Sequence, residues 1–327
     1  MSYLKKSDKY DRKSLYDNIV KYFFLFLALV CASFVIFIAV FVCFKGLYPF
    51  FHNYSLTEGE VIKQSFVSFF SSPRWLYDGN GGMIFLLLTT LFVTLLSLII
   101  SVPTSIFTAL FLVRMVPGKL KVFLQLCVEM LSSIPSVIYG LFGVGVICPM
   151  IKNIGVETYG GRSILSAVIV LALMSIPTIT MLSITAMEAV DKRRIDASIA
   201  LGASSMQTNF KIVISSAQSG IFAGIILGIG RALGEATAVQ MVIGNNSLGT
   251  SFYNIFSPGN TLTSAMLSGI GEATGIGYDV RFCLGLVLIV VIMLVSFILN
   301  SLKRRLTAIE KKETLLARLL KRKEKAK

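Results

Sequence analysis

Six long blocks of apolar residues, separated by shorter polar segments, organise the chain. Each block is long enough to cross a hydrocarbon core about 30 Å thick, which takes roughly 20 helical residues. Inside lipid, backbone N–H and C=O groups have no water to bond, so each block must be helical. The pattern therefore predicts an all-α, polytopic membrane protein with six transmembrane helices. The predicted spans are Phe23–Phe44, Met83–Val113, Val122–Met150, Ser163–Met187, Ser219–Ile243 and Arg281–Leu302.

The composition agrees with this pattern. Of the 327 residues, 55% are hydrophobic and 15% are charged, and the mean hydropathy is +0.78, values that exclude a soluble domain. The first block is about twice as long as a signal-peptide core, and the sequence after it offers no small-x-small cleavage site, so we expect a retained span. The five cysteines lie in or at the ends of the blocks without a CxxC pair, which favours packing roles over disulfides or metal binding.

The formal net charge of +14 raises the question whether the chain binds nucleic acid. Of the 31 Lys and Arg residues, 24 lie before the first block, between the second and third, between the fourth and fifth, or after the sixth. The other connections hold five, and the last two are Arg231 and Arg281. The positive-inside rule then predicts that both termini are cytoplasmic. No separate basic domain remains, so nucleic-acid binding is not expected.

The chain divides into a basic N-terminal segment (1–21), a six-span domain (22–302) and a basic C-terminal tail (303–327). The N-terminal segment is predicted to be either a short helix on an anionic membrane surface, which then turns into the first span, or a disordered tail. The C-terminal tail carries apolar residues at near-helical spacing among eleven cations, which favours an amphipathic surface helix.

Two long loops lie on the predicted outer side, Lys45–Gly82 and Gly244–Val280. Loops of this size favour a docking surface for a partner, with structureless connections as the alternative. The apolar patch Ala265–Leu267 in the second loop predicts a re-entrant or surface helix.

The chain has no residues arranged for catalysis. It contains no GxxxxGK[ST] loop, its one histidine is His52, and its carboxylates and cysteines show no catalytic or metal-ligand spacing. We therefore expect neither an enzyme nor a cofactor. No internal repeat relates the first three blocks to the last three, which argues against a secondary transporter.

The connection between the fourth and fifth blocks, about residues 188–215, is the most informative polar segment. Good helix formers surround one interior glycine, Gly202. Ile195, Ile199 and Met206 fit one helical stripe, and the glycine is placed to end one helix just before a second begins. Two short helices joined by a turn would form a knob that enters a groove on a soluble partner.

The same segment resembles a known family. Asp196–Gly202, followed by Ile212 ten residues after the glycine, resembles the "EAA…G…I-LP" loop of binding-protein-dependent ABC importer permeases. Asp196 stands where the family has Glu, Ser198 where it has the second Ala, and Ser215 near the usual Pro. In that family the loop docks on a cytoplasmic ATPase and transmits its closure to the spans. The resemblance implies ATPase coupling by residues matched to the motif: Asp196, Ala197, Leu201 and Gly202.

Two further stretches, Ile134–Gly140 and Gly230–Val239, resemble the phosphate-specific PstC-type permeases, and "GRALGE" is closer to PstC than to its partner PstA. The resemblance covers about residues 83–302. It implies a type I ABC importer permease fold in the cell inner membrane and a role in phosphate uptake. The partners it implies are a second, PstA-like permease, a PstB-like ATPase dimer, an extracytoplasmic PstS-like phosphate-binding protein and membrane lipid. The alternatives are a permease for another oxyanion and an ion-coupled anion symporter.

The fifth block contains the candidate substrate-path residues. Arg231 lies at its midpoint, where a charge costs at least about 2.5–3.5 kcal/mol, so its side chain should face protein or water. Glu235, four residues on, is expected on the same helix face and close enough to pair. The pair is predicted either to line an anion path, with Glu235 favouring protonated phosphate over sulfate, or to be purely structural. Glu129 in the third block is a further candidate, expected to line the lower part of the path, to pair with an internal cation or to lie near the cytoplasmic interface.

Small residues and prolines complete the pattern of the spans. Glycines at 220, 224 and 228, and at 230 and 234, remove side chains from two faces of the fifth block, which predicts close helix contacts. The sequence does not say whether the facing helix belongs to this chain. Prolines 103, 135, 149 and 177 are expected to bend or end the second, third and fourth spans.

Overall fold

The computed structural model describes residues 2–55, 61–72, 74–75, 81–154, 159–246 and 253–324. Within this part of the chain, six helices are long and apolar enough to cross a membrane. The all-α, six-span prediction is therefore confirmed. The candidate spans are Asp17–Phe51, Ile84–Arg114, Ser136–Asn153, Tyr159–Glu188, Ser205–Gly234 and Gly275–Arg304.

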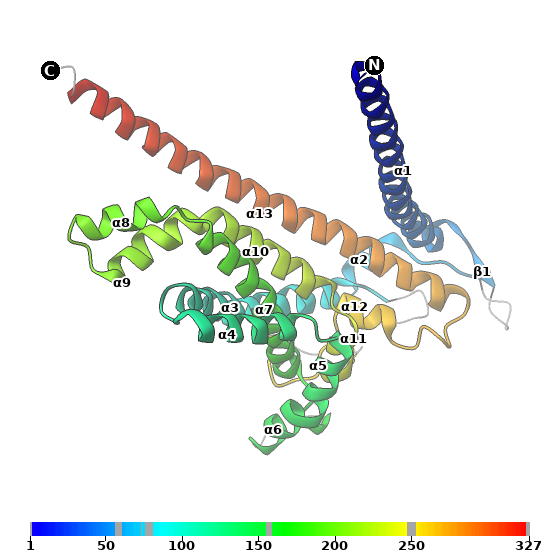
Figure 1. The fold of residues 1–327 in the computed structure, drawn as a ribbon. Coiled ribbons are helices and arrows are strands. Elements are labelled where there is room, and N and C mark those ends of the chain that lie inside the picture. Colours follow the sequence, from blue (N-terminus) through cyan, green and yellow to red (C-terminus); the bar gives the residue numbers. More distant parts are fainter. Residues whose placement is uncertain are drawn as a thin grey trace.

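The elements follow one another along the chain as Figure 1 shows. They are α1 (Ser2–Phe51), β1 (Tyr54–Ser55), β2 (Val61–Ile62), α2 (Phe66–Ser71), α3 (Ile84–Arg114), α4 (Gly118–Ser132), α5 (Ser136–Phe142), the π-helical η1 (Gly143–Ile147), α6 (Cys148–Asn153), the 3₁₀ turn η2 (Tyr159–Gly161), α7 (Ile164–Glu188), α8 (Lys192–Ala200), α9 (Ser205–Thr208), the π-helical η3 (Asn209–Ile214), α10 (Ser215–Gly234), α11 (Thr237–Val242), α12 (Leu262–Leu267) and α13 (Gly275–Glu324). The two strands pair antiparallel, with Tyr54 opposite Ile62.

Helix α7 is the centre of the bundle and packs against α3, α10 and α4. Two-thirds of its most apolar window, 67%, is buried, whereas none of the corresponding window of α1 is. Helix α13 runs along the bundle, and α1 joins it through the end that precedes the β-hairpin (Figure 1). The opposite end of α1 projects away from the bundle, and both chain ends lie toward the same side of the molecule. An even number of spans requires this arrangement of the ends.

The two terminal segments continue the first and last spans. Helix α1 runs from Ser2 to Phe51 without a break, so the predicted turn before the first span is wrong, as is the alternative of a disordered tail. Helix α13 likewise continues from Gly275 to Glu324. Its helical state agrees with the prediction for the C-terminal tail, although no break separates it from the last span.

Two predicted spans are interrupted. The third block is divided at Ile134-Pro135 into α4 and α5, so the candidate span is Ser136–Asn153 and α4 is a separate helix. Proline lacks an N–H and disfavours a helical residue before it, which explains the division. The fifth block ends as a helix at Gly234 and resumes at Thr237 in α11. The prediction of one continuous span over Ser219–Ile243 is therefore wrong.

Both long loops contain packed structure. The first forms the hairpin and α2, and its Trp75 is fully buried in a cluster with Phe69 and Met83. In the second, α12 buries Leu262 and Ala265 against α13, α11 and α3. Of the two predictions for α12, the surface helix is wrong. The described parts of these loops thus complete the core at the end of the molecule opposite α8 and α9 (Figure 1).

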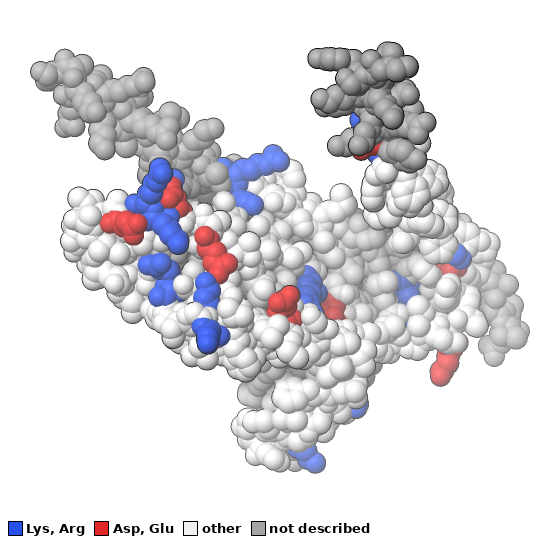
Figure 2. Space-filling model, in the orientation of Figure 1, with Lys and Arg blue, Asp and Glu red and all other residues white. Residues whose placement is uncertain are grey.

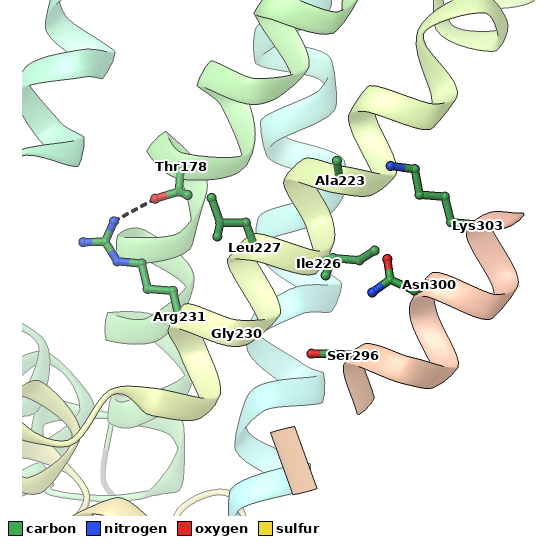
Figure 3. A pocket seen from close by; sticks show the side chains of 9 residues that line it. All are labelled: Thr178, Ala223, Ile226, Leu227, Gly230, Arg231, Ser296, Asn300 and Lys303. Atoms are coloured by element: carbon green, nitrogen blue, oxygen red, sulfur yellow. Dashed lines mark hydrogen bonds between the residues drawn. The ribbon is translucent and has the colours of Figure 1, made fainter. Parts of the chain in front are cut away.

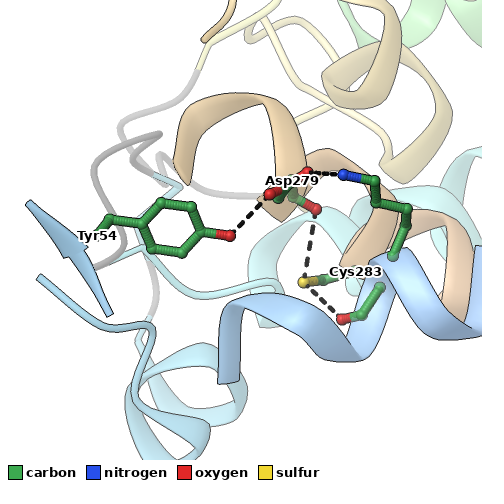
Figure 4. A network of polar contacts seen from close by, with 5 residues as sticks. Tyr54, Asp279 and Cys283 are labelled. Atoms are coloured by element: carbon green, nitrogen blue, oxygen red, sulfur yellow. Dashed lines mark hydrogen bonds and ion pairs between the residues drawn. The ribbon is translucent and has the colours of Figure 1, made fainter. Parts of the chain in front are cut away.

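A buried carboxylate ties α1, the hairpin and α13 together (Figure 4). Asp279 is 6% exposed. Its carboxylate accepts a hydrogen bond from the Lys45 ammonium at 3.1 Å and another from the Tyr54 hydroxyl at 2.8 Å. Burial, together with the bond to Asp279, raises the pKa of the Tyr54 phenol above its usual range, so this hydroxyl stays protonated and donates. Close by, the Cys283 thiol donates to the Gly46 carbonyl at 3.0 Å.

Asp279→Asn is expected to destabilise the protein by about 2 kcal/mol, because it leaves the Lys45 ammonium without its counter-charge. This value is below the range of about 3–5 kcal/mol for fully buried pairs, since the Lys45 side chain is 38% exposed. Thermal unfolding of the purified, detergent-solubilised protein measures the effect. Glu272→Gln, at an exposed acid near the start of α13, is the matched control. Equal unfolding temperatures for the two variants would contradict a stabilising role of the contact.

Candidate functional site

The two interrupted spans meet at their interruptions. Ser136 begins α5 directly after Pro135, and Thr237 begins α11. The two hydroxyl oxygens lie 2.9 Å apart, and α5 packs against α11. The first turns of α5 and α11, which are far apart in the sequence, therefore lie next to each other in space. Each start presents backbone N–H groups without partners in its own helix.

Glu235 occupies the gap between α10 and α11. Its carboxylate accepts hydrogen bonds from the Thr237 hydroxyl at 2.9 Å and from the Ala238 N–H at 3.1 Å. This is the bonding pattern of a helix cap, and a negative charge at a helix N-terminus is favourable. The Glu235 carbonyl accepts a further bond from the Thr263 hydroxyl at 2.8 Å. The gap is therefore stabilised by α11 itself and by α12.

Arg231 lies in the last turn of α10 and is half-buried. Its guanidinium donates to the Thr178 hydroxyl of α7 at 2.7 Å (Figure 3). The ion pairs among the described residues do not include Arg231 with Glu235. The predicted pairing is therefore wrong. The reason is that the helix does not continue through Glu235, whose backbone is extended with φ −74° and ψ 122°. The side chains of Arg231 and Glu235 therefore do not share a helix face.

Arg231 lines a cavity of about 590 Å³ between α7, α10 and α13. Figure 3 shows α10 in the middle, with Arg231 reaching toward Thr178 and with polar side chains of α13 on the other side. The lining residues are Thr178, Ala223, Ile226, Leu227, Gly230, Arg231, Ser296, Asn300 and Lys303. Among the described residues, the lining thus holds two cations, several hydrogen-bond donors and no carboxylate. Such a lining attracts anions.

Glu129, the third predicted path residue, lies elsewhere. It is exposed on α4, outside the candidate span Ser136–Asn153. It does not line the cavity around Arg231. The structure therefore brings none of the three predicted path residues into direct contact with another, and only Arg231 lines the cavity.

The connection between α7 and α10 has the predicted helix–glycine–helix form. Helix α8 ends before Gly202, whose φ of +85° is left-handed and favours glycine. Helix α9 then begins with a capping box between Ser204 and Gln207. The most exposed large apolar side chain here is Leu201, at 89%. Asp196, Ala197 and Gly202 are also exposed. We name the surface of α8, the turn and α9 the α8–α9 knob.

The knob is fastened to the bundle on its inner side. Ile195 is 8% exposed and packs in a cluster with residues of α3, α7 and α10. The buried Asn209 amide oxygen accepts from the Arg114 guanidinium of α3 at 2.9 Å. The Ser198 and Thr208 hydroxyls lie 3.0 Å apart and join α8 to α9. A displacement of the knob would therefore be passed to α3 and α10. The stripe predicted for Ile195, Ile199 and Met206 does not pack as a unit, since only Ile195 is buried and the other two side chains are exposed.

The glycine-rich face of α10 meets α7 of this same chain. A Cβ atom at Gly220 would lie 2.4 Å from the Ala186 Cβ, and one at Gly228 would lie 2.7 Å from Ile179 Cγ1. The close contact predicted from these glycines is therefore confirmed, and the facing helix is identified. By contrast, Gly230 and Gly234 have open space at their Cβ positions. That second face is left uncovered by the described chain.

The charges are unevenly spread over the surface (Figure 2). On the face shown, Lys and Arg gather around the α8–α9 knob and the adjoining part of α13. Most of the remaining surface is uncharged, and a small group of charges interrupts it near its centre. This distribution is typical of a membrane protein with one basic side.

The sequence analysis missed the residues that hold Arg231 and Glu235 in place. Thr178 is 53 positions from Arg231, and Thr263 is 28 from Glu235. Hydroxyl residues are common in membrane helices, so nothing singled these two out. The Arg114–Asn209 contact was missed for the same reason. Asn300 and Lys303 carried a local signal, since they are polar residues near the end of a very apolar block.

With this geometry in hand, comparison with known proteins identifies the family. The family model "Binding-protein-dependent transport system inner membrane component" matches residues 101–308. The chain belongs to this family. The match includes the α8–α9 knob, Arg231, Glu235 and the cavity. The resemblance noted from the sequence motifs is thus confirmed, and the chain is an inner-membrane component of a binding-protein-dependent transport system.

Several relatives resemble this permease over most of its length. It is 33% identical over 283 residues to the "Probable ABC transporter permease protein YqgH" of Bacillus subtilis (strain 168), covering 85% of this chain and 88% of the relative. It is also 33% identical over 275 residues to the "Phosphate transport system permease protein PstC" of Pasteurella multocida (strain Pm70), covering 76% and 83%.

A solved structure of a bacterial alginate ABC transporter shares the fold of this permease. One of its chains matches with a TM-score of 0.58 and 18% identity, over 87% of this chain and 95% of that one. At this identity the likeness concerns the fold, and it places the permease among ABC importer permeases in architecture.

Proposed function

We propose that this chain is one permease subunit of an ATP-driven phosphate importer, where it forms half of the translocation path. The observation that carries the proposal is its 33% identity to a PstC phosphate permease over 275 residues. The chemistry of the cavity supports the substrate class. A half-buried guanidinium suits phosphate oxygens, because it offers charge-assisted hydrogen bonds in a low-dielectric site.

The importer needs parts that this chain does not supply. The sequence has no phosphate-binding loop for ATP, so a dimer of a PstB-like ATPase would hydrolyse the nucleotide and dock on the α8–α9 knob. The exposed Leu201 and the left-handed Gly202 give the knob a tip suited to a groove. A PstA-like permease would form the other half of the path, and the open Gly230–Gly234 face suits close helix contact. A PstS-like binding protein would deliver phosphate from outside.

Uptake assays test the substrate. The complete transporter is expressed in cells lacking other phosphate importers, and entry of labelled phosphate is measured with excess sulfate, molybdate or phosphonate. We expect none of the three to suppress uptake as strongly as unlabelled phosphate. Stronger suppression by one of them would assign the transporter to that oxyanion. Uptake that persists without ATP or the binding protein would instead identify an ion-coupled symporter.

The charge distribution predicts the orientation, with the knob and both termini in the cytoplasm. Single cysteines at Tyr159 and Lys119, both exposed positions, test it in a background without the five natural cysteines. An impermeant thiol reagent added to intact cells should label Tyr159→Cys and should label Lys119→Cys only after permeabilisation. Labelling of Lys119→Cys in intact cells would overturn the orientation.

A further inference from the structure

One face of α13 is polar near the C-terminal end of its span. The span Gly275–Arg304 has a mean hydropathy of 3.2 in its most apolar window, the highest value among the six candidate spans. Ser296, Asn300 and Lys303 are spaced by four and three residues, which places them on one helix face. All three line the cavity that Arg231 lines. Polar groups near lipid are costly, so their convergence on one cavity calls for a ligand or water there.

The rest of α13 at this level shows the contrast. Leu294, Phe297 and Ile298 are 56%, 73% and 55% exposed, as expected for side chains that face lipid. Across the cavity, α10 contributes Ala223, Ile226, Leu227 and Gly230, which are apolar or small. Apart from Arg231, the α10 wall therefore offers space, and the α13 wall offers donors. An amide, a hydroxyl and an ammonium together present hydrogen-bond donors to an anion.

We propose that Lys303, with Asn300 and Ser296, forms a second binding position for a phosphate group, on the side of the cavity nearer the α8–α9 knob. Figure 3 shows Lys303 beside Ala223 and Arg231 at the opposite end of the same stretch of α10. Eight residues of helix separate Ala223 from Arg231, or about 12 Å. Lys303 and Arg231 therefore lie at separate levels of the cavity, and we expect a phosphate to pass from one to the other.

Two positions of moderate strength suit transport better than one strong position. An anion must bind well enough to enter and weakly enough to leave, and successive sites meet both needs. The cavity volume of 590 Å³ equals that of roughly twenty waters, so it holds a phosphate with part of its hydration shell. The lining residues that the structure describes include no carboxylate that would repel the anion.

The phosphate group has two conceivable sources, the imported anion and the headgroup of an anionic lipid. The proposed function favours the imported anion, and the inference rests on it for the identity of that anion. Lys303→Gln removes the charge, and Arg304→Gln makes the same change at the next residue, which is exposed and does not line the cavity. Lys303→Arg keeps the charge.

The test uses the complete transporter reconstituted in vesicles of phosphatidylcholine alone and in vesicles that also contain phosphatidylglycerol. Lys303→Gln is expected to lower phosphate uptake about tenfold, the loss of one charge-assisted hydrogen bond. Arg304→Gln should stay close to wild type, and Lys303→Arg should restore most uptake. A loss in both vesicle types identifies the imported anion as the ligand, and a loss confined to phosphatidylglycerol vesicles identifies the headgroup. Equal uptake by Lys303→Gln and Arg304→Gln in both vesicle types overturns the proposal.

A measurement without transport guards against a variant that fails to assemble. Asn300→Cys, in the cysteine-free background, is treated with anionic and cationic thiosulfonates. Adding Lys303→Gln should lower the ratio of anionic to cationic reaction rates severalfold, whereas adding Arg304→Gln should not. Unchanged ratios would also overturn the proposal. If the wild-type transporter carries another oxyanion, the proposed function fails, and the same variants assayed with that oxyanion still decide the role of Lys303.

Discussion

Gly202→Trp is expected to abolish phosphate uptake while the permease remains folded and inserted. The φ of +85° at Gly202 disfavours a side chain, at a cost of about 1–3 kcal/mol. A Cβ atom there would meet nothing within 4 Å among the described residues, and Gly202 is exposed, so we expect the bundle itself to stay folded. The indole would instead project from the tip of the α8–α9 knob. If an ATPase groove receives that tip, docking fails and uptake falls more than about thirtyfold, the effect of losing a central contact of an interface.

Two controls separate the causes of this loss. Gly118→Trp places the same side chain at another exposed glycine with open space, at the start of α4, and should transport normally. Gly202→Asn keeps a residue that tolerates the left-handed conformation without the bulk, and should lose less uptake than Gly202→Trp. Co-purification of the ATPase with each variant measures docking directly. Wild-type uptake and co-purification with Gly202→Trp would exclude the knob tip as the docking element.

Much of the fold was predictable because lipid leaves few choices. Six blocks of sufficient length had to be helices, and six helices of that kind are present. The division at Pro135 was foreseeable from proline chemistry. The gap at Glu235 was not, since glycine is frequent inside membrane helices and Gly234 alone does not mark a helix end. It depends on contacts with Thr237, Ala238 and Thr263, and such contacts exist only after folding.

Individual residues of the candidate site could be predicted from the sequence, but the contacts between them could not. Arg231 stood out because an arginine in an apolar block is costly, and it does line a cavity. The partner assigned to it was wrong, because the spacing of four residues implies a shared face only while the helix continues. The knob was predicted more fully, since Gly202 and the flanking helix formers act locally. Patterns formed by neighbouring residues can be recognised in a sequence, whereas a contact between helices, such as that of Arg231 with Thr178, cannot.

The separation of Arg231 from Glu235 changes what their substitutions should do. Were they paired, removing Arg231 alone would strand a buried carboxylate and be worse than removing both. In the structure the Glu235 carboxylate is bound by the Thr237 hydroxyl and the Ala238 N–H. Losing Arg231 therefore leaves Glu235 satisfied. The effects of the two substitutions on uptake should be nearly additive, with a coupling below about 0.5 kcal/mol.

Arg231→Gln is accordingly expected to lower phosphate uptake at least about tenfold, because the cavity loses a charge-assisted donor to the anion. Arg162→Gln, at an exposed arginine outside the cavity, is the control. Glu235→Gln keeps an oxygen that can cap α11 and should be milder than Glu235→Ala, which removes the cap. The cycle is completed by measuring uptake for Arg231→Gln, for Glu235→Gln and for the double variant that combines them, in complexes confirmed to assemble. If the double variant transports better than Arg231→Gln, the two residues interact as an ion pair after all. Wild-type uptake by Arg231→Gln would show that the guanidinium has a purely structural role.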